Sequence, residues 1–300
     1  MQNNNPIAIP QADDGVEIKI SFWDRLQRRQ SKLITYLFLI LMSLPFIFPF
    51  WWMITSSFKN INEILGTPSL LPASWQFRNF IDIFTYQPYA RHYFNSTYIA
   101  ILVTVGTLFV SSLAGYGFAR IHFPGNSVLF LLLLSAMMMP IEVTIIPNFF
   151  LFKALGLTDS HVPLIVLPIL GSNGVLAVFM MRQFFLEIPT ELEEAGMLDG
   201  LNRFGIFWHI ALPLARPALG AVAILTFLFN WNSFLEPLVF INDINLFTLP
   251  LSLNNFNDPY GLPLWHLQLA ATTLSVIPIL LVYLFAQRQV TNTMALSGMK

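Results

Sequence analysis

The chain has 300 residues, of which 55% are hydrophobic and 10% are charged, and its mean hydropathy is +0.64. A soluble domain carries about 25% charged residues, so this composition excludes an ordinary soluble protein and indicates one embedded in a membrane. The net charge of −1 excludes the basic excess of nucleic-acid-binding proteins, and the lack of cysteine excludes disulfides, thiolate metal sites and cysteine nucleophiles.

Six apolar stretches follow one another along the chain, each long enough to cross a hydrocarbon core of roughly 30 Å as a helix of about 20 residues. Helices satisfy every backbone polar group within lipid. We therefore predict an all-α integral membrane protein with six transmembrane helices, at Leu33–Ile54, Ser96–Ala119, Ser127–Phe152, Val162–Met181, Pro217–Leu235 and Gln268–Gln287. Residues 1–32 form an N-terminal segment, 33–288 the membrane domain and 289–300 a C-terminal tail. The length and late start of the first stretch favour a span over a signal peptide.

Lysine and arginine are distributed unevenly between the two sides of these spans. With the N-terminus inside, eleven of them lie on the inner side, namely Lys19, Arg25, Arg28, Arg29, Lys32, Arg120, Arg182, Arg203, Arg216, Arg288 and Lys300. Four lie outside, namely Lys59, Arg78, Arg91 and Lys153. This positive-inside bias predicts two cytoplasmic termini, an outer loop at 55–95 and a cytoplasmic loop at 185–215.

The outer loop is rich in aromatic residues, and two interpretations remain open. The first is an aromatic belt at the membrane interface. The second is a surface that docks an external partner. The residues concerned are Trp51, Trp52, Trp75, Tyr86, Tyr89 and Tyr93.

The cytoplasmic loop has the pattern of two short helices. Thr190 and Glu193 fit a capping box, and Gly200 supplies the end of the first helix. A second helix is expected from Asn202 to about Ile210, ended by Pro213.

Large apolar residues in this loop, Ile206, Phe207, Trp208 and Ile210, must pack against the bundle or against a partner. A solvated acidic linker would explain the five acidic residues from Glu187 to Asp199 but not these side chains.

The spacing of the loop resembles a known family. Glu194-Ala195, Gly200, Ile210 and Leu212-Pro213 are similar to the "EAA" loop of ABC-importer permeases. Motifs along most of the chain resemble the maltose-type sugar permeases, in particular the smaller six-span subunit of that heterodimer: Ser57-Phe58-Lys59, Asn95-Ser96, Ala114-Gly115-Tyr116, Phe118-Ala119-Arg120, Phe123-Pro124-Gly125, Leu155-Gly156-Leu157 and Trp231-Asn232. The chain departs from the family pattern at Gly196, Leu201 and the tail 295–300.

The resemblance implies the type I ABC importer permease fold, in a bacterial inner membrane, with a coupling helix seated in a separate ATPase. It implies a second permease, two ATPase subunits and an extracytoplasmic solute-binding protein as partners. The coupling residues would be Glu191, Glu194, Ala195, Gly196, Asp199, Gly200, Arg203, Leu212 and Pro213.

The implied substrate is a carbohydrate: an oligosaccharide, a disaccharide or a related glycoside or polyol. The alternatives are a permease for a non-sugar solute such as glycerol phosphate, or a secondary transporter. The chain has no G-x-x-x-x-G-K-[ST] loop, so ATP and Mg²⁺ are expected on the partner, and neither catalysis nor a bound cofactor or metal is expected here. A secondary transporter would show internal repeats and ionisable residues deep in the spans, and neither is evident.

Polar residues within or near the spans are candidates for the translocation path: Asn230, Trp231, Asn232, Glu236 and Glu142. Amides beside an aromatic ring suit a sugar, but a polar clamp between helices explains the same residues. Glu142 is either functional or reaches interfacial water. Pro140 and Pro147 are expected to kink the third span.

Overall fold

The computed structural model describes residues 22–297, and side chains from 32 to 284. Within that range the regular structure is helical, apart from an isolated antiparallel bridge between Asn257 and Pro263. The predicted all-α class is confirmed. The predicted N-terminal segment covers residues 1–32. Its residues 1–21 lie outside the described part of the chain, and the segment is helical from Phe22.

The chain divides into two units, residues 1–52 and 53–300. Helix α1 (Phe22–Ser56) supplies the described part of the first unit and continues through Pro45 and Pro49. Its stretch Lys32–Ser56 has 25 residues with a mean hydropathy of 2.2, which suffices to cross a membrane.

The second unit contains the remaining candidate spans. Three are long apolar helices: α4 (Tyr89–Arg120), α7 (Val162–Leu170) running into α8 (Ser172–Glu187), and the first part of α15 (Trp265–Ser297). Two more are bent pairs: α5 (Asn126–Ser135) with the 3₁₀ turn η1 (Ala136–Met138) followed by α6 (Ile141–Ala154), and residues 203–214 followed by α12 (Arg216–Trp231). The described residues thus hold four candidate spans, or six if each bent pair crosses as one.

The third span is broken rather than kinked. The chain bends by 99° between η1 and α6. Pro140 lacks an N–H and drives the preceding Met139 into extended conformation (ψ 115°), so the helix ends there. Pro147, in contrast, lies inside the continuous helix α6.

Two span boundaries also differ from the prediction. The second span begins at Tyr89 instead of Ser96, directly after Pro88. The fifth ends at Trp231 instead of Leu235, with Asn232 as its C-cap. Helix α15 continues into the tail predicted from 289 and ends at Ser297; residues 298–300 lie outside the described part.

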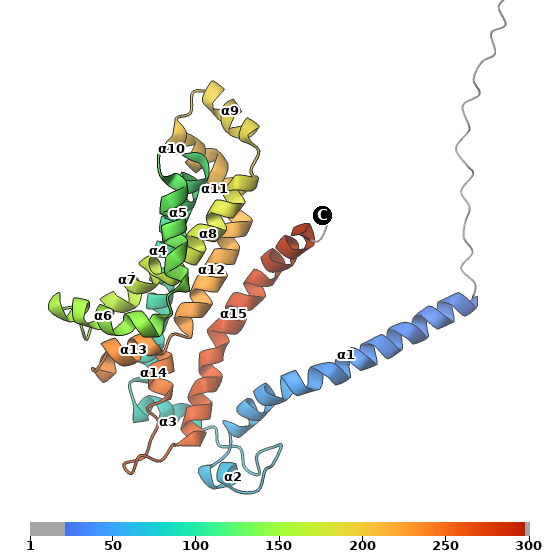
Figure 1. The fold of residues 1–300 in the computed structure, drawn as a ribbon. Coiled ribbons are helices and arrows are strands. Elements are labelled where there is room, and N and C mark those ends of the chain that lie inside the picture. The colour runs from blue at the N-terminus through green and yellow to red at the C-terminus, as the bar shows by residue number, and fades with distance from the viewer. Residues whose placement is uncertain (1–21, 298–300) are drawn as a thin grey trace, which may run out of the picture. The chain divides into compact units, whose positions relative to one another are not determined.

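Helix α4 is central in the second unit and packs against α7, α8 and α12, while α15 packs against α12 and α3 (Figure 1). Helix α9 (Thr190–Leu198) lies at one end of this bundle and α3 (Asn79–Tyr86) at the opposite end. We call these the α9 end and the α3 end.

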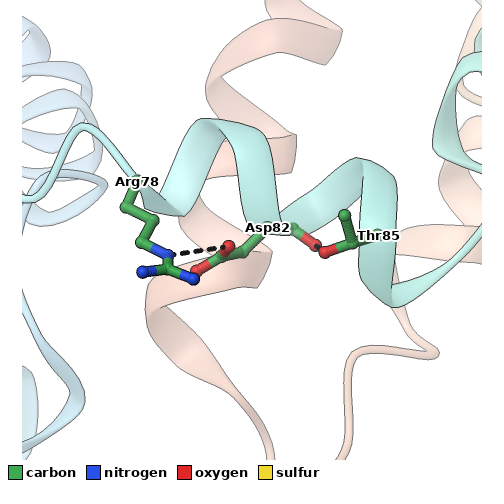
Figure 2. Close-up of polar contacts among 3 residues, drawn as sticks. All are labelled: Arg78, Asp82 and Thr85. Carbon is green, nitrogen blue, oxygen red and sulfur yellow. Dashed lines mark hydrogen bonds and ion pairs between the residues drawn. The ribbon is translucent and has the colours of Figure 1, made fainter.

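The outer loop is folded around short helices at the α3 end. Helix α2 (Ile61–Leu65) is capped by Asn60, and the buried Asn79 donates to Ser57 O and Lys59 O, both at 2.9 Å. The exposed side of α3 carries an Arg78–Asp82 ion pair of 3.4 Å, and Thr85 Oγ1 donates to Asp82 O (Figure 2). An exposed pair of this kind stabilises little.

The aromatic residues of this loop do not share one environment. Tyr89 is buried and its hydroxyl donates to Ala271 O at 2.6 Å. Tyr93 packs edge-on against Trp231, whereas Trp75 is exposed beside Phe58. Tyr89 and Tyr93 therefore belong to the bundle core. The two interpretations of this loop, an interfacial belt and a docking surface, then apply to its exposed rings, such as Trp75.

A polar framework attaches the segment after α12 to α4. This segment contains α13 (Leu235–Phe240), η3 (Ile244–Leu246) and α14 (Leu249–Leu253). His92 Nε2 donates to Ile244 O at 2.7 Å, and Asn95 donates to the carbonyls of Asn245 and Phe247. Ser96 Oγ accepts from Leu249 N at 2.7 Å. The N-terminal turns of α4 thereby hold η3 and the start of α14 in place.

Candidate functional site

The loop predicted at 185–215 begins in the structure after α8, at Ile188. It consists of α9, α10 (Arg203–Ile206), the π-helical turn η2 (Phe207–Ala211) and α11 (Leu212–Leu214). Gly200 ends α9 with φ +87°, the left-handed conformation that glycine adopts freely. The predicted glycine stop is confirmed.

The predicted capping box is wrong. Pro189 occupies the N-cap and Thr190 is the first helical residue, without a side-chain cap bond. The carboxylate of Glu193 is directed instead to Arg120 of α4, with Oε1 3.0 Å from Nε. A tertiary ion pair has replaced the local cap.

The second short helix also differs from its prediction. Asn202 caps it as expected and accepts from Gly205 N at 2.8 Å. Pro213 does not end it, because the helix that begins at Arg203 continues through Pro213 to Leu214. The break comes at Ala215, where the axis turns by 74° into α12.

The apolar residues of the loop divide between bundle and surface. Ile206 and Phe207 are buried, and Phe207 packs against Tyr116 and Phe185. Phe204 and Trp208 stack on each other and remain exposed. The α10–η2 portion is therefore anchored to the bundle on one side and presents aromatic rings on the other.

Helix α9 turns most of its residues outward. Only Glu193 and Gly196 are buried in it. A Cβ at Gly196 would lie 2.6 Å from Ile210 Cδ1, so the small residue there allows contact within the chain rather than with another protein. Gly196, which the resemblance placed among the coupling residues, therefore faces its own chain instead of a partner.

The other residues expected to contact an ATPase are placed as follows. The exposed ones are Glu191, Glu194, Ala195, Asp199, Gly200 and Arg203, and Leu198 beside them is 90% exposed. Arg203 also donates to Arg120 O at 3.4 Å. Leu212 and Pro213 are half-buried, and Leu212 packs on the core beneath the loop. The α9 surface is thus open, acidic and partly apolar.

A second feature of the bundle is a cavity of roughly 700 Å³ between the α5–α6 break, α7, α8 and α12. Three of the predicted path residues line it: Asn230, Asn232 and Glu236. Glu236 is buried, and its carboxylate accepts from Ser233 Oγ at 2.5 Å. These three residues come from the end of α12 and the start of α13.

Two predicted path residues do not line this cavity. Trp231 is buried between helices, with its indole N–H donating to Ser275 O at 3.1 Å and its ring stacked on Phe227. It forms the clamp between α12 and α15 that the sequence left as an alternative. Glu142 is exposed in the first turn of α6.

Sequence reasoning missed Ser172 and Asn173, which line the same cavity at the N-terminus of α8. The available signal was Gly171, which separates α7 from α8 and places these two polar residues at a helix start in mid-span. Among the described side chains no three His, Asp or Glu residues gather as metal ligands.

The profile of one protein family covers both of these sites. Residues 107–295, from the middle of α4 to near the end of α15, match the family described as "Binding-protein-dependent transport system inner membrane component". The chain belongs to this family. It is accordingly a multi-pass, inner-membrane permease component of a transport system that depends on a binding protein.

Curated relatives of this permease match nearly end to end. The arabinooligosaccharides transport system permease protein AraQ of Bacillus subtilis (strain 168) is 35% identical over 88% of this chain and 94% of its own length. The sn-glycerol-3-phosphate transport system permease protein UgpE of Pectobacterium atrosepticum is 31% identical over 87% and 95%.

The permease fold is also found in a solved structure. A subunit of a bacterial ABC transporter involved in the import of the acidic polysaccharide alginate superposes with a TM-score of 0.71 at 21% identity. The match covers 89% of this chain and 98% of that one. At this identity the likeness shows the fold, and it confirms the predicted ABC importer permease architecture.

Proposed function

We propose that this permease carries a carbohydrate, such as an oligosaccharide, a disaccharide or a related glycoside or polyol, into the cell, driven by ATP that a separate subunit hydrolyses. The observation that carries the proposal is α9: a short helix fixed to the bundle through buried residues, with acidic and apolar side chains left uncovered. An uncovered surface of this kind marks a protein interface.

The ATPase would bind the exposed face of α9. Glu191 and Glu194 offer ionic contacts, and Ala195 permits close approach. Gly200 holds the turn behind the helix, and Leu212 with Pro213 joins it to α12. ATP and Mg²⁺ belong to that partner in this proposal. A second permease, two ATPase subunits and an external binding protein complete the complex, and both termini of this chain lie in the cytoplasm.

The cavity supports a neutral, hydroxyl-rich substrate. Its volume falls within the roughly 300–1,000 Å³ of small-molecule sites, and Asn173, Asn230 and Asn232 offer amide donors and acceptors. Its lining within the described chain includes no Lys or Arg, and its one charged residue is Glu236.

Glycerol phosphate is the second candidate, favoured by the similarity to UgpE. A phosphate needs cationic or N–H donors to replace its water. The carboxylate of Glu236 would repel it, so the cavity favours the carbohydrate unless a partner permease supplies the cations.

The test uses the complex purified from its native membrane through a tag on this chain and reconstituted with its binding protein. We expect ATP-dependent uptake of an arabino-oligosaccharide or a maltodextrin, and none of glycerol 3-phosphate. Uptake of glycerol 3-phosphate alone would overturn the carbohydrate assignment.

The docking part of the proposal is tested by Glu194→Lys combined with Gly200→Asp. The ATPase should no longer copurify, or its stimulation by the binding protein should vanish. Glu187→Gln, an exposed acidic residue at the end of α8, is the matched control and should change neither. Undiminished stimulation in the double variant would show that α9 is not the docking helix.

A further inference from the structure

The ion pair between Arg120 and Glu193 joins the last turn of α4 to α9. Arg120 Nε lies 3.0 Å from Glu193 Oε1, and the two side chains are only 9% and 12% exposed. A second guanidinium nitrogen of Arg120 donates to Ile188 O, just before α9 begins. Arg120 therefore binds both the entrance of α9 and its buried face.

Other cationic side chains converge on the same helix end. Arg182 donates to Phe118 O and Arg203 to Arg120 O, both at 3.4 Å. The carbonyls at a helix C-terminus carry partial negative charge and attract such groups. Within the described part of the chain, Glu193 is the one carboxylate that forms an ion pair with any of these three arginines, and it pairs with Arg120.

Few other contacts hold α9 in a fixed orientation. A helix of nine residues is not stable by itself, so its orientation depends on tertiary contacts. Those contacts come from its two buried residues: Glu193 on Arg120, and Gly196 on Ile210. The second is a contact with the flexible end of a side chain, which leaves the ion pair as the charged contact on the buried face of α9.

Helix α4 extends from this ion pair to the α3 end. Its 32 residues correspond to about 48 Å at 1.5 Å per residue. At its other end His92, Asn95 and Ser96 hold η3 and the start of α14. One continuous helix therefore connects α9 with a segment at the opposite end of the bundle.

We propose that Arg120 and Glu193 are positioning residues: their ion pair makes α9 and α4 move as one body, so that displacement of α9 reaches the segment around η3. This deepens the proposed function and rests on it, because the displacing force is assigned to the docked ATPase. Neither residue touches the substrate or ATP.

The first experiment measures coupling in the reconstituted complex. Glu193→Gln keeps the shape of the side chain and removes its charge. The ATPase should still copurify in the wild-type amount, while stimulation of ATP hydrolysis by the binding protein should fall at least five-fold. Glu193→Asp, which keeps the charge, should reduce it less than Glu193→Gln does. Glu187→Gln is again the control.

The second experiment requires no ATPase. The chain has no native cysteine, so Leu198→Cys introduces a single spin label on exposed α9. In the purified permease, Glu193→Gln should increase the mobility of the label in its electron paramagnetic resonance spectrum, and Glu193→Asp should increase it less.

The outcomes separate this inference from the proposed function. An immobile label in Glu193→Gln, or stimulation equal to that of Glu187→Gln, overturns the positioning role while the docking of α9 stands. A mobile label in a permease that never binds an ATPase overturns the docking proposal while the ion pair keeps its role in orienting α9. A label as mobile in Glu193→Asp as in Glu193→Gln shows a packing defect and also overturns the inference.

Discussion

Several residues of this permease act through contacts with residues that are distant in the sequence. Gly200 is an exception, since a glycine at a helix end has a local meaning and was readable from the sequence. Glu193 shows the opposite: its local pattern predicted a cap, and a guanidinium 73 positions earlier in the chain binds it instead. Buried charge is costly unless it is paired, so the tertiary partner outweighs the local one.

Asp159 is another residue whose role depends on distant chain. It has a positive φ of 56° in the loop between α6 and α7, and its Oδ1 accepts from the backbone N–H groups of Asn242 at 2.8 Å and Asp243 at 3.0 Å. We predict that Asp159→Ala lowers the melting temperature by about 2–4 °C, because both bonds are lost and alanine disfavours this φ. Asp159→Asn keeps an acceptor oxygen and tolerates this φ, so it should lose less. Equal losses in the two variants, by thermal unfolding in detergent, would contradict this.

Asp159 also makes the stability of the folded permease depend on pH. Hydrogen bonds from the backbone of Asp243 and Asn242 lower the pKa of Asp159 below its usual value. A carboxylate with a lowered pKa stabilises the folded state above the unfolded pKa, about 3.9, and this contribution is lost as pH falls through the folded pKa. The difference in melting temperature between wild type and Asp159→Asn should be constant near neutral pH and shrink below pH 4. A difference that grows on acidification would refute the assignment.

At the scale of elements, local composition predicted the helices well and their ends less well. Long apolar stretches identified the candidate spans of the described residues, since lipid leaves the backbone no other arrangement. The breaks depended on detail: Pro140 stops a helix, whereas Pro147 and Pro213 do not. The difference lies in the backbone around each proline, which the sequence alone does not reveal.

The end of α12 allows neighbouring residues to be compared. Trp231→Ala should destabilise the permease by about 3–5 kcal/mol, because a buried aromatic side chain is removed from the interface with α15. Asn232→Ala, one position on and exposed to the cavity, should change stability by less than about 0.5 kcal/mol.

For transport by variants that fold, we expect the opposite order, with the larger effect at Asn232. Asn232→Ala should raise the KM for uptake of the active oligosaccharide in proteoliposomes, while Trp231→Phe, which keeps the ring packing, should not. An unchanged KM in Asn232→Ala would remove this residue from the translocation path.

At the scale of the whole molecule, orientation follows from charge counting and can be tested directly. Glu187 at the α9 end and Tyr260 at the α3 end are both exposed, and Glu187 lies outside the proposed docking face. In the cysteine-free chain, Tyr260→Cys should react with a membrane-impermeant maleimide in intact spheroplasts, and Glu187→Cys only after permeabilisation. The reverse pattern would place α9 outside the cell, where no ATPase could reach it.

The sequence by itself determined the membrane class, the positions of the spans and the glycine-ended helix between two of them. These features depend on hydropathy and backbone preference, which act over a few neighbouring residues. The tertiary structure decided which polar residues meet: Glu193 with Arg120, Trp231 with Ser275, and Asn230 and Glu236 with Asn173 around one cavity. Such pairings depend on how helices far apart in the chain pack against each other, and residue type and spacing carry no record of that packing.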